Sequence, residues 1–298
     1  MLRIFIIATL PLLFVFSSEI FSFLSGVLCP SCNCEPAKPL NRLPRPQLRS
    51  EFLALENGTD ATLECEEDGY RMHVFSREPL VVYFEEFVST KEREHLLDIS
   101  EKIYMPSTIT HNGGKTSDRN TKVRDSEVAL VPRTEGVRCI EGRARAVQGW
   151  REDVWIERLR VQKYNPGGHY SHHFDWSSGR GGWGRVSSFM VWVHGEELEG
   201  GGTEFPRLNL RGDKKKWCKF IECEDEATSG EDLKANEDNT PEDKEGVVFK
   251  VIPGNAVYWE NFRSDGTGRG YNETWHAGLP VTKGVKVGLN IWSWGRID

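Results

Sequence analysis

The chain has 298 residues, which is enough for one large domain with a leader or for two small domains. All ten tryptophans lie at or beyond Trp150, and this asymmetry favours one main domain behind an N-terminal extension. The formal net charge of −7 argues against a nucleic-acid partner, because phosphate binding needs clustered Lys and Arg.

Residues 1–28 are expected to be a signal anchor or a signal peptide. Arg3 precedes an apolar run from Ile4 to Leu28 that only Glu19 interrupts. An uncleaved run of this length could just span a bilayer, whereas the part before Glu19 suits a cleaved signal; a buried core helix is the third alternative. Because the positive residue comes first, we expect the remaining chain to lie in the lumen of the secretory pathway. The protein would then be a type II protein of the endoplasmic reticulum membrane or, if the run is cleaved, a secreted protein.

Residues 29–78 are expected to form a linker or N-terminal extension, because their prolines stand among polar residues. These prolines are Pro36, Pro39, Pro44 and Pro46. The segment begins with three cysteines, one fewer than the ligands of a structural zinc site. Disulfide or lipid chemistry beside the membrane is therefore favoured there, and no special role is the alternative. The three are Cys29, Cys32 and Cys34.

Seven cysteines and two glycosylation sequons agree with an oxidising lumen. Cys218 and Cys223 are separated by four residues, and we expect a local disulfide between them. The pairing of the other cysteines, among them Cys65 and Cys139, stays open. The sequons are Asn57-Gly58-Thr59 and Asn272-Glu273-Thr274.

The main domain is expected at residues 79–298, with helices before strands. Ser89 and Glu92 form a capping-box pattern ahead of one helix, and apolar residues from Val137 to Val147 indicate a second. Beyond Trp150 the apolar pattern changes to period two, which is typical of strands. The strand runs are 159–162, 186–193, 247–251 and 285–292. We therefore predict an α+β, mainly β fold with a double-stranded β-helix, or jelly-roll, core flanked by N-terminal helices.

Two histidines and one aspartate have the spacing of a metal site. His173 and Asp175 lie two residues apart on a predicted strand, so both project from the same face. His276 comes much later, just before another strand. Two imidazoles and one carboxylate on one side of a metal leave the other positions open, as in non-haem Fe(II) oxygenases. A structural zinc site would instead be closed by four ligands.

Lys286 lies ten residues after His276, in a run of alternating apolar residues. If Val285 and Val287 face one side of the strand, Lys286 faces the other and points into the barrel. A buried ammonium needs an anion, and a dicarboxylate co-substrate would supply one. A solvent-facing lysine on an edge strand is the alternative.

Four ordered motifs cover the C-terminal half of the chain. They are YNPGGHYSHHFD at 164–175, GGGTEFP at 200–206, PGNA at 253–256, and His276 through Lys286 to Trp292. The stretch from Leu159 to Asp298 resembles the catalytic domain of the prolyl 4-hydroxylase alpha-type Fe(II)/2-oxoglutarate dioxygenases, and looks closest to their fungal members. A weaker similarity extends back to about residue 80.

The resemblance implies a role for each matching residue. The implied Fe(II) ligands are His173, Asp175 and His276. Lys286 would pair with the distal carboxylate of 2-oxoglutarate, with Tyr164 and Thr203 as hydrogen-bonding helpers. The reaction would use O2 to hydroxylate an unactivated C–H bond, release succinate and CO2, and need L-ascorbate as reductant.

Tyr170, Arg185 and Trp292 match family positions close to the substrate proline. Alternatively, Tyr170 and Trp292 only pack the barrel, and Arg185 is a surface charge at the start of a strand. The favoured function is 4-hydroxylation of peptidyl proline. The same chemistry on a free amino acid or another small molecule, and a non-catalytic jelly-roll binding module, are the alternatives.

In two features the sequence differs from the family, and these differences limit which family properties are expected of this chain. Residues 35–85 are too few and too polar to form the separate peptide-substrate domain of the animal enzymes, so we expect a monomer without a disulfide-isomerase subunit. Within the catalytic core at 155–298, residues 211–246 form a long acidic insertion that we expect to be a solvated loop. Loops at the mouth of such a barrel choose the substrate.

Overall fold

The computed structural model describes most of the main domain. The described ranges are 45–55, 63–111, 116–149, 151–177, 182–210, 212–223 and 246–297. The expected leader, the cysteines of residues 29–34, the sequon at Asn57 and the acidic residues 224–245 lie outside them. Within these ranges, no helix is long and apolar enough to cross a membrane.

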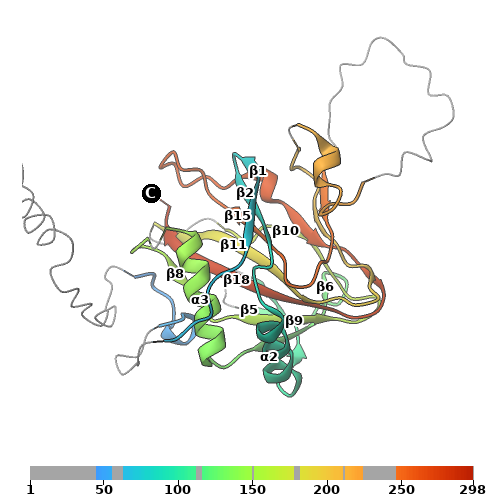
Figure 1. Cartoon of the computed structure of the whole chain (residues 1–298). Coiled ribbons are helices and arrows are strands. Elements are labelled where there is room, and N and C mark those ends of the chain that lie inside the picture. The colour runs from blue at the N-terminus through green and yellow to red at the C-terminus, as the bar shows by residue number, and fades with distance from the viewer. Residues whose placement is uncertain are drawn as a thin grey trace, which may run out of the picture. The chain divides into compact units, whose positions relative to one another are not determined.

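An antiparallel sheet of nine strands forms the larger layer of the domain (Figure 1). In spatial order its strands are β1 (Arg71–Arg77), β2 (Leu80–Glu85), β15 (Ala256–Glu260), β11 (Trp183–His194), β18 (Lys286–Arg296), β9 (Arg160–Tyr164), β7 (Glu127–Leu130) and β3 (Met105–Pro106), and β8 (Trp155–Ile156) pairs with β18. All four period-two runs of the sequence fall on strands. The prediction of a mainly β fold is therefore confirmed.

A second antiparallel sheet packs face to face against the first. Its strands are, in order, β14 (Val247–Phe249), β13 (Thr203–Phe205), β16 (His276–Gly278), β10 (His169–His173) and β6 (Arg124–Asp125). Buried aromatic rings join the two layers: the centroids of Phe205 and Trp259 are 5.2 Å apart, and those of Tyr83 and Phe249 are 5.9 Å apart. Two short pairs complete the strands, β12 (Glu199–Gly200) with β17 (Val281–Lys283) and β4 (Ile109–His111) with β5 (Thr116–Asp118).

Two helices lie on one side of the larger sheet (Figure 1). α2 (Thr90–Glu101) begins with the predicted capping box, in which Ser89 Oγ accepts from the Glu92 backbone and the Glu92 carboxylate accepts from the Ser89 backbone. α3 (Glu135–Val147) is capped by the side chain of Thr134. Short 3-10 turns are η1 (Ser50–Phe52), η2 (Lys214–Trp217) and η3 (Asn272–Thr274).

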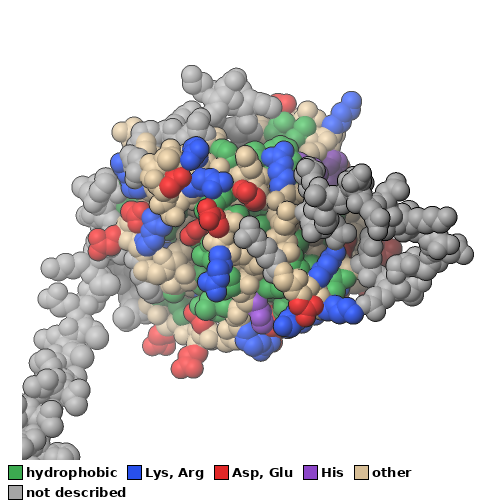
Figure 2. Space-filling model, turned by 90° about the horizontal axis from the view of Figure 1, so that it is seen from above, with side chains coloured by type: hydrophobic (Ala, Val, Ile, Leu, Met, Phe, Trp, Pro, Cys, Tyr) green, Lys and Arg blue, Asp and Glu red, His purple; other side chains and the backbone are tan. Residues whose placement is uncertain are grey.

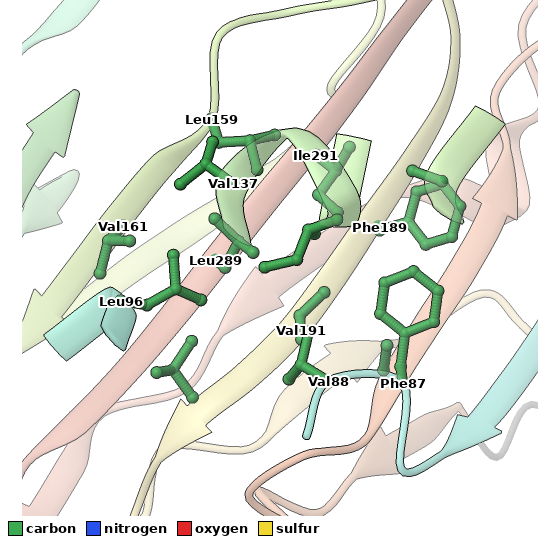
Figure 3. Packing of buried hydrophobic residues seen from close by; sticks show 14 of the residues in the cluster. Phe87, Val88, Leu96, Val137, Leu159, Val161, Phe189, Val191, Leu289 and Ile291 are labelled. Carbon is green, nitrogen blue, oxygen red and sulfur yellow. The ribbon is translucent and has the colours of Figure 1, made fainter. Parts of the chain in front are cut away.

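The helices and the larger sheet share one apolar core (Figure 3). Leu96 of α2 and Val137 of α3 are fully buried in it, together with Val161 of β9 and Leu289 of β18. Each such side chain contributes about 1.5–3 kcal/mol relative to an exposed one. Because side chains alternate along a strand, these apolar residues direct Lys286 to the opposite face, toward the smaller sheet.

The larger sheet begins earlier than the sequence predicts. β1 lies within residues 29–78, the range that the sequence assigns to the linker, yet it pairs with β2 along its length. Two strands thus precede the helices, so the expected order of helices before strands is wrong. β1 is an edge strand in which the apolar residues Met72 and Val74 are 61% and 51% exposed and only Phe75 is buried, so its apolar residues do not mark a buried face.

The segment before β1 is also tied to the domain. Cys65 forms a disulfide with Cys139 of α3. The buried guanidinium of Arg143, also in α3, binds the carboxylates of Asp68 and Glu92. The described end of the expected linker is therefore packed structure rather than a spacer.

The expected acidic insertion starts with ordered structure. Cys218 and Cys223, which follow η2, form the predicted disulfide. Between them, Phe220 is buried and stacks on Tyr83 of β2 with ring centroids 4.2 Å apart. The bridge thereby fixes the start of the insertion against the larger sheet.

Charges of both signs are interspersed on the face shown in Figure 2. Exposed pairs such as Lys283 with Glu199, 3.0 Å apart, and Lys91 with Glu66, 2.8 Å apart, are typical of the described surface. Such pairs contribute less than about 1 kcal/mol each. The fold therefore depends on its apolar layers rather than on its surface charge.

Candidate active site

Three side chains with metal-binding atoms converge between the two sheets. His173 ends β10 and His276 begins β16, and the two residues are paired in register. Nε2 of His173 lies 3.6 Å from Oδ1 of Asp175, and Nε2 of His276 lies 3.9 Å from its Oδ2. The three ligand atoms all lie within 4.8 Å of one another. The structure thus brings together the three residues that the sequence selects.

Backbone carbonyls orient both imidazoles. Nδ1 of His173 lies 2.8 Å from the oxygen of Ser171, and Nδ1 of His276 lies 2.8 Å from the oxygen of Thr274. A carbonyl oxygen only accepts, so each Nδ1 carries a hydrogen and each Nε2 faces Asp175. Two nitrogen lone pairs and a carboxylate that face one another at this range need a cation between them, either a proton or a metal ion.

The protonation states suit a metal ion. Burial opposes ionisation of Asp175, but the imidazoles of His173 and His276 hold its pKa below the usual range, so it is a carboxylate. Burial, reinforced by the nearby His173, lowers the pKa of His276 to about 4, so this ring is neutral at physiological pH. Carboxylate and neutral imidazole are the forms that ligate metals.

Aromatic residues from both sheets fix the ligands. Phe205 of β13 stacks on the ring of His276 with centroids 5.3 Å apart, and Trp259 of β15 meets it edge-on at 4.9 Å. Nε1 of Trp292 donates to Oδ2 of Asp175 at 2.9 Å. Contacts of this kind keep a ligand in one orientation and one protonation state.

Lys286 is buried at the start of β18, with 2% of its surface exposed. Its Nζ donates to the carbonyl oxygen of Gly201 at 2.5 Å and lies 5.4 Å from the ring centroid of Tyr164. Burial lowers the pKa of Lys286 to about 7, and no charged group among the described residues offsets this effect. An ammonium in this position favours an anionic ligand.

The surroundings of Lys286 provide a hydrogen-bonding group for such an anion. Oγ1 of Thr203 is buried without a partner among the described residues. Gly278, which pairs with Thr203, has no Cβ, and one built there would lie 4.0 Å from Nζ of Lys286. The hydroxyl of Tyr164 donates to Oε1 of Gln162 at 3.2 Å. A carboxylate beside Lys286 would pair with the ammonium and accept from Thr203.

The three residues expected on the substrate side surround the metal-binding cluster. Tyr170 stacks on His173 with ring centroids 3.7 Å apart. The guanidinium of Arg185 lies 4.2 Å from the ring centroid of Trp292 and donates to the backbone oxygen of Asp175 at 3.3 Å. Arg185 is therefore not a surface charge, because it packs directly on residues that orient the cluster.

Glu157 is a residue of this site that the sequence patterns do not predict. Its buried carboxylate accepts from Nε of Arg185 at 2.6 Å, from Arg160 at 2.9 Å and from Nε1 of Trp294 at 2.6 Å. Burial opposes its ionisation, but the charge and hydrogen bonds of Arg185 lower the pKa of Glu157 below the usual range. No local pattern marks it, since only its place between the buried residues Ile156 and Leu159 hints at an inward carboxylate.

His172 points away from the cluster, as the alternation along β10 predicts. Its Nε2 lies 2.6 Å from the carboxylate of Glu204, and its ring lies 6.0 Å from that of Trp275. It belongs to the outer face of the smaller sheet.

Residues 159–294 match the family model described as the 2OG-Fe(II) oxygenase superfamily. This stretch contains His173, Asp175, His276 and Lys286. Residues 159–294 therefore carry a 2OG-Fe(II) oxygenase domain, and the family match together with the curated relatives supports 2-oxoglutarate-dependent dioxygenase chemistry in it. The family implies Fe(II), 2-oxoglutarate and O2, and the ligand set and the buried Lys286 fit the metal and the co-substrate.

Within this class, the protein is similar to prolyl 4-hydroxylases. The human prolyl 4-hydroxylase subunit alpha-3 is 24% identical over 257 residues, which cover 83% of this chain and only 39% of the relative. The probable prolyl 4-hydroxylase 3 of Arabidopsis thaliana is 25% identical over 226 residues, or 74% of this chain and 70% of the relative.

A solved viral structure is also similar. The 2OG complex of the collagen prolyl hydroxylase from Paramecium Bursaria Chlorella virus-1 has 22% identity and a TM-score of 0.48, and the alignment covers 72% of this chain and 96% of that chain. The family match and the curated relatives confirm the resemblance to prolyl 4-hydroxylases. The expected closeness to fungal members stays a prediction.

Proposed function

We propose that this protein 4-hydroxylates proline residues of a peptide or protein, with release of succinate and CO2. His173, Asp175 and His276 would hold Fe(II), which together with 2-oxoglutarate and O2 supplies the oxidant for an unactivated C–H bond. The observation that carries the proposal is the convergence of these three ligands within 4.8 Å in a barrel that also buries Lys286.

The co-substrate would be anchored at its distal carboxylate. Lys286 is the cation for this group, and the hydroxyl of Thr203 is a second donor, with Tyr164 beside them. Because the ammonium is buried, its attraction for a carboxylate is much stronger than at a protein surface. Binding would raise the pKa of Lys286 from about 7 and keep it charged.

A prolyl substrate suits the residues on the other side of the cluster. Tyr170, which stacks on His173, and Trp292, which lies against Arg185, make this side of the site aromatic, and an aromatic lining suits a pyrrolidine ring. Arg185 already has its counter-charge in Glu157, so its remaining N–H groups favour a neutral acceptor such as a peptide carbonyl. This balance favours a peptide over a free amino acid, whose carboxylate would compete with Glu157.

Mass spectrometry tests the substrate. The purified protein would be incubated with Fe(II), ascorbate, 2-oxoglutarate and either proline-rich peptides or a panel of free amino acids and other small molecules. We expect the mass of one oxygen atom to be added to proline, with stoichiometric succinate. Modification of small molecules alone would favour the second substrate class. No turnover by folded, iron-loaded protein would favour a binding module.

We also propose that the catalytic domain works as a monomer in the lumen of the secretory pathway, held at the endoplasmic reticulum membrane by residues 1–28 or secreted, with ascorbate as reductant. The disulfides Cys65–Cys139 and Cys218–Cys223 support an oxidising compartment. Asn272 is exposed, so a glycan there would not disturb the core. Membrane extraction and endoglycosidase digestion of the full chain test the location, and light scattering tests the monomer. A protein that is unglycosylated and has reduced cysteines in cells would contradict the lumenal location.

A further inference from the structure

Gln162 is a buried polar residue inside the barrel that the proposed function does not use. It lies on β9 and is 1% exposed. Its Oε1 accepts from the hydroxyl of Tyr164 at 3.2 Å, whereas its Nε2 has no partner among the described residues. A buried amide N–H is costly unless it is paired, so an unpaired one inside a ligand-binding barrel points to a missing acceptor.

The position of Gln162 is fixed by strand register. β9 pairs with β18 so that Tyr164 is opposite Lys286 and Gln162 is opposite Gly288, two residues further along. On the same face of β18, Trp292 donates to Asp175. Gln162 therefore stands between the ammonium of Lys286 and the metal-binding cluster, along the path that a dicarboxylate would occupy when bound to both.

We propose that the side-chain amide of Gln162 donates a hydrogen bond to an oxygen of bound 2-oxoglutarate. In this structure the hydroxyl of Tyr164 donates to Oε1 of Gln162. The bond from Tyr164 directs Oε1 to one side and leaves the two N–H bonds of Nε2 for other acceptors. This inference rests on the proposed function of the same site.

Calorimetric titration of 2-oxoglutarate into Mn(II)-loaded protein tests the contact without turnover. Gln162→Leu keeps the size of the side chain and removes the amide. Its affinity for 2-oxoglutarate should fall by at least about tenfold, which is the loss expected when a charged acceptor loses one hydrogen-bond donor. Gln162→Glu keeps an acceptor for Tyr164 but replaces the donor with a negative charge, so its loss should be at least as large.

A matched control separates this contact from general packing. Gln148 is another partly buried glutamine, and its amide bonds to Ser187, Ser293 and the carbonyl oxygen of Ala144, away from the cluster. Gln148→Leu should lower thermal stability and leave the affinity of the folded protein for 2-oxoglutarate unchanged. The affinity losses at Gln162 should occur in variants that melt cooperatively.

The outcomes distinguish this inference from the proposed function. If Lys286→Met weakens 2-oxoglutarate binding but a folded Gln162→Leu does not, a buried water satisfies the amide and the inference is overturned. If wild-type protein binds Mn(II) but not 2-oxoglutarate, the proposed function itself fails.

Discussion

Replacing Lys286 with methionine should stabilise the metal-free protein. The side chain is 2% exposed, and burial lowers its pKa from 10.5 to about 7. A tenfold change in proton affinity is worth about 1.4 kcal/mol, so burying this lysine costs on the order of 4 kcal/mol near pH 7. Methionine avoids this cost, but loss of the hydrogen bond to Gly201 lowers the free energy of unfolding by about 1 kcal/mol. The net gain of about 3 kcal/mol should raise Tm by at least about 5 °C.

The same substitution should weaken 2-oxoglutarate binding strongly. The distal carboxylate of the co-substrate would be buried without a counter-ion, which costs about 3 kcal/mol or more and raises Kd more than about 100-fold. Calorimetric scanning and titration of Mn(II)-loaded protein measure the two effects. Lys283→Met is the control, because Lys283 is exposed and paired with Glu199, and neither quantity should change.

The dependence on pH gives this prediction a second check. The folded protein holds Lys286 with a lower proton affinity than the unfolded chain, so the unfolded chain binds more protons between about pH 7 and 10.5. The stability penalty is therefore full below pH 7 and fades as the pH rises toward 10.5. A lower Tm for Lys286→Met at neutral pH, or an unchanged affinity for 2-oxoglutarate, would refute the reasoning.

Three further predictions follow from single contacts. Trp292→Phe keeps a ring but removes the bond to Asp175, so Mn(II) affinity measured against a chelating dye should fall about tenfold; an equal affinity would show that this bond does not orient the ligand. Replacing both Cys218 and Cys223 with serine opens a short loop and should lower the unfolding free energy in denaturant titrations by about 2 kcal/mol, and unchanged stability would contradict this. Because the pKa of Lys286 in the empty site is about 7, 2-oxoglutarate affinity should be constant at lower pH and fall about tenfold per pH unit above it, whereas a flat calorimetric profile would argue against an ammonium anchor.

The parts of the fold that the sequence predicts are those with a long local pattern. α2 has a capping box, β18 is a long central strand whose apolar residues alternate, and β11 carries a continuous apolar run that is buried on both faces. β1 is not predicted because only Phe75 in it is buried, and β6 is not predicted because it has only two residues. Edge strands and very short strands are set by their neighbours rather than by their own sequence.

In the candidate site, too, local sequence patterns predict some features and not others. The alternation of strand residues turns Lys286 inward, as observed. His173 and Asp175 do converge, but the expectation that both lie on one strand is wrong, because β10 ends at His173 and Asp175 lies in the bend that follows. The meeting of these residues with His276 depends on strands far apart in the chain, and there only the resemblance to a family supplied the prediction. Glu157 binds Arg185, which comes 28 residues later in the chain, and no local sequence pattern predicts this contact.

The contacts of Arg185 also link the two ends of the site. It is bound by Glu157, lies over Trp292 and donates to the backbone of Asp175, while Trp292 donates to the carboxylate of the same aspartate. A substrate group that engages Arg185 therefore acts on a residue already in contact with the backbone of the metal-binding Asp175. Because Glu157 is buried and ionised, displacing Arg185 would remove its nearer cation and leave only Arg160 to offset its charge. Arg185 is thus better suited to donate its spare N–H groups to a substrate than to move toward one.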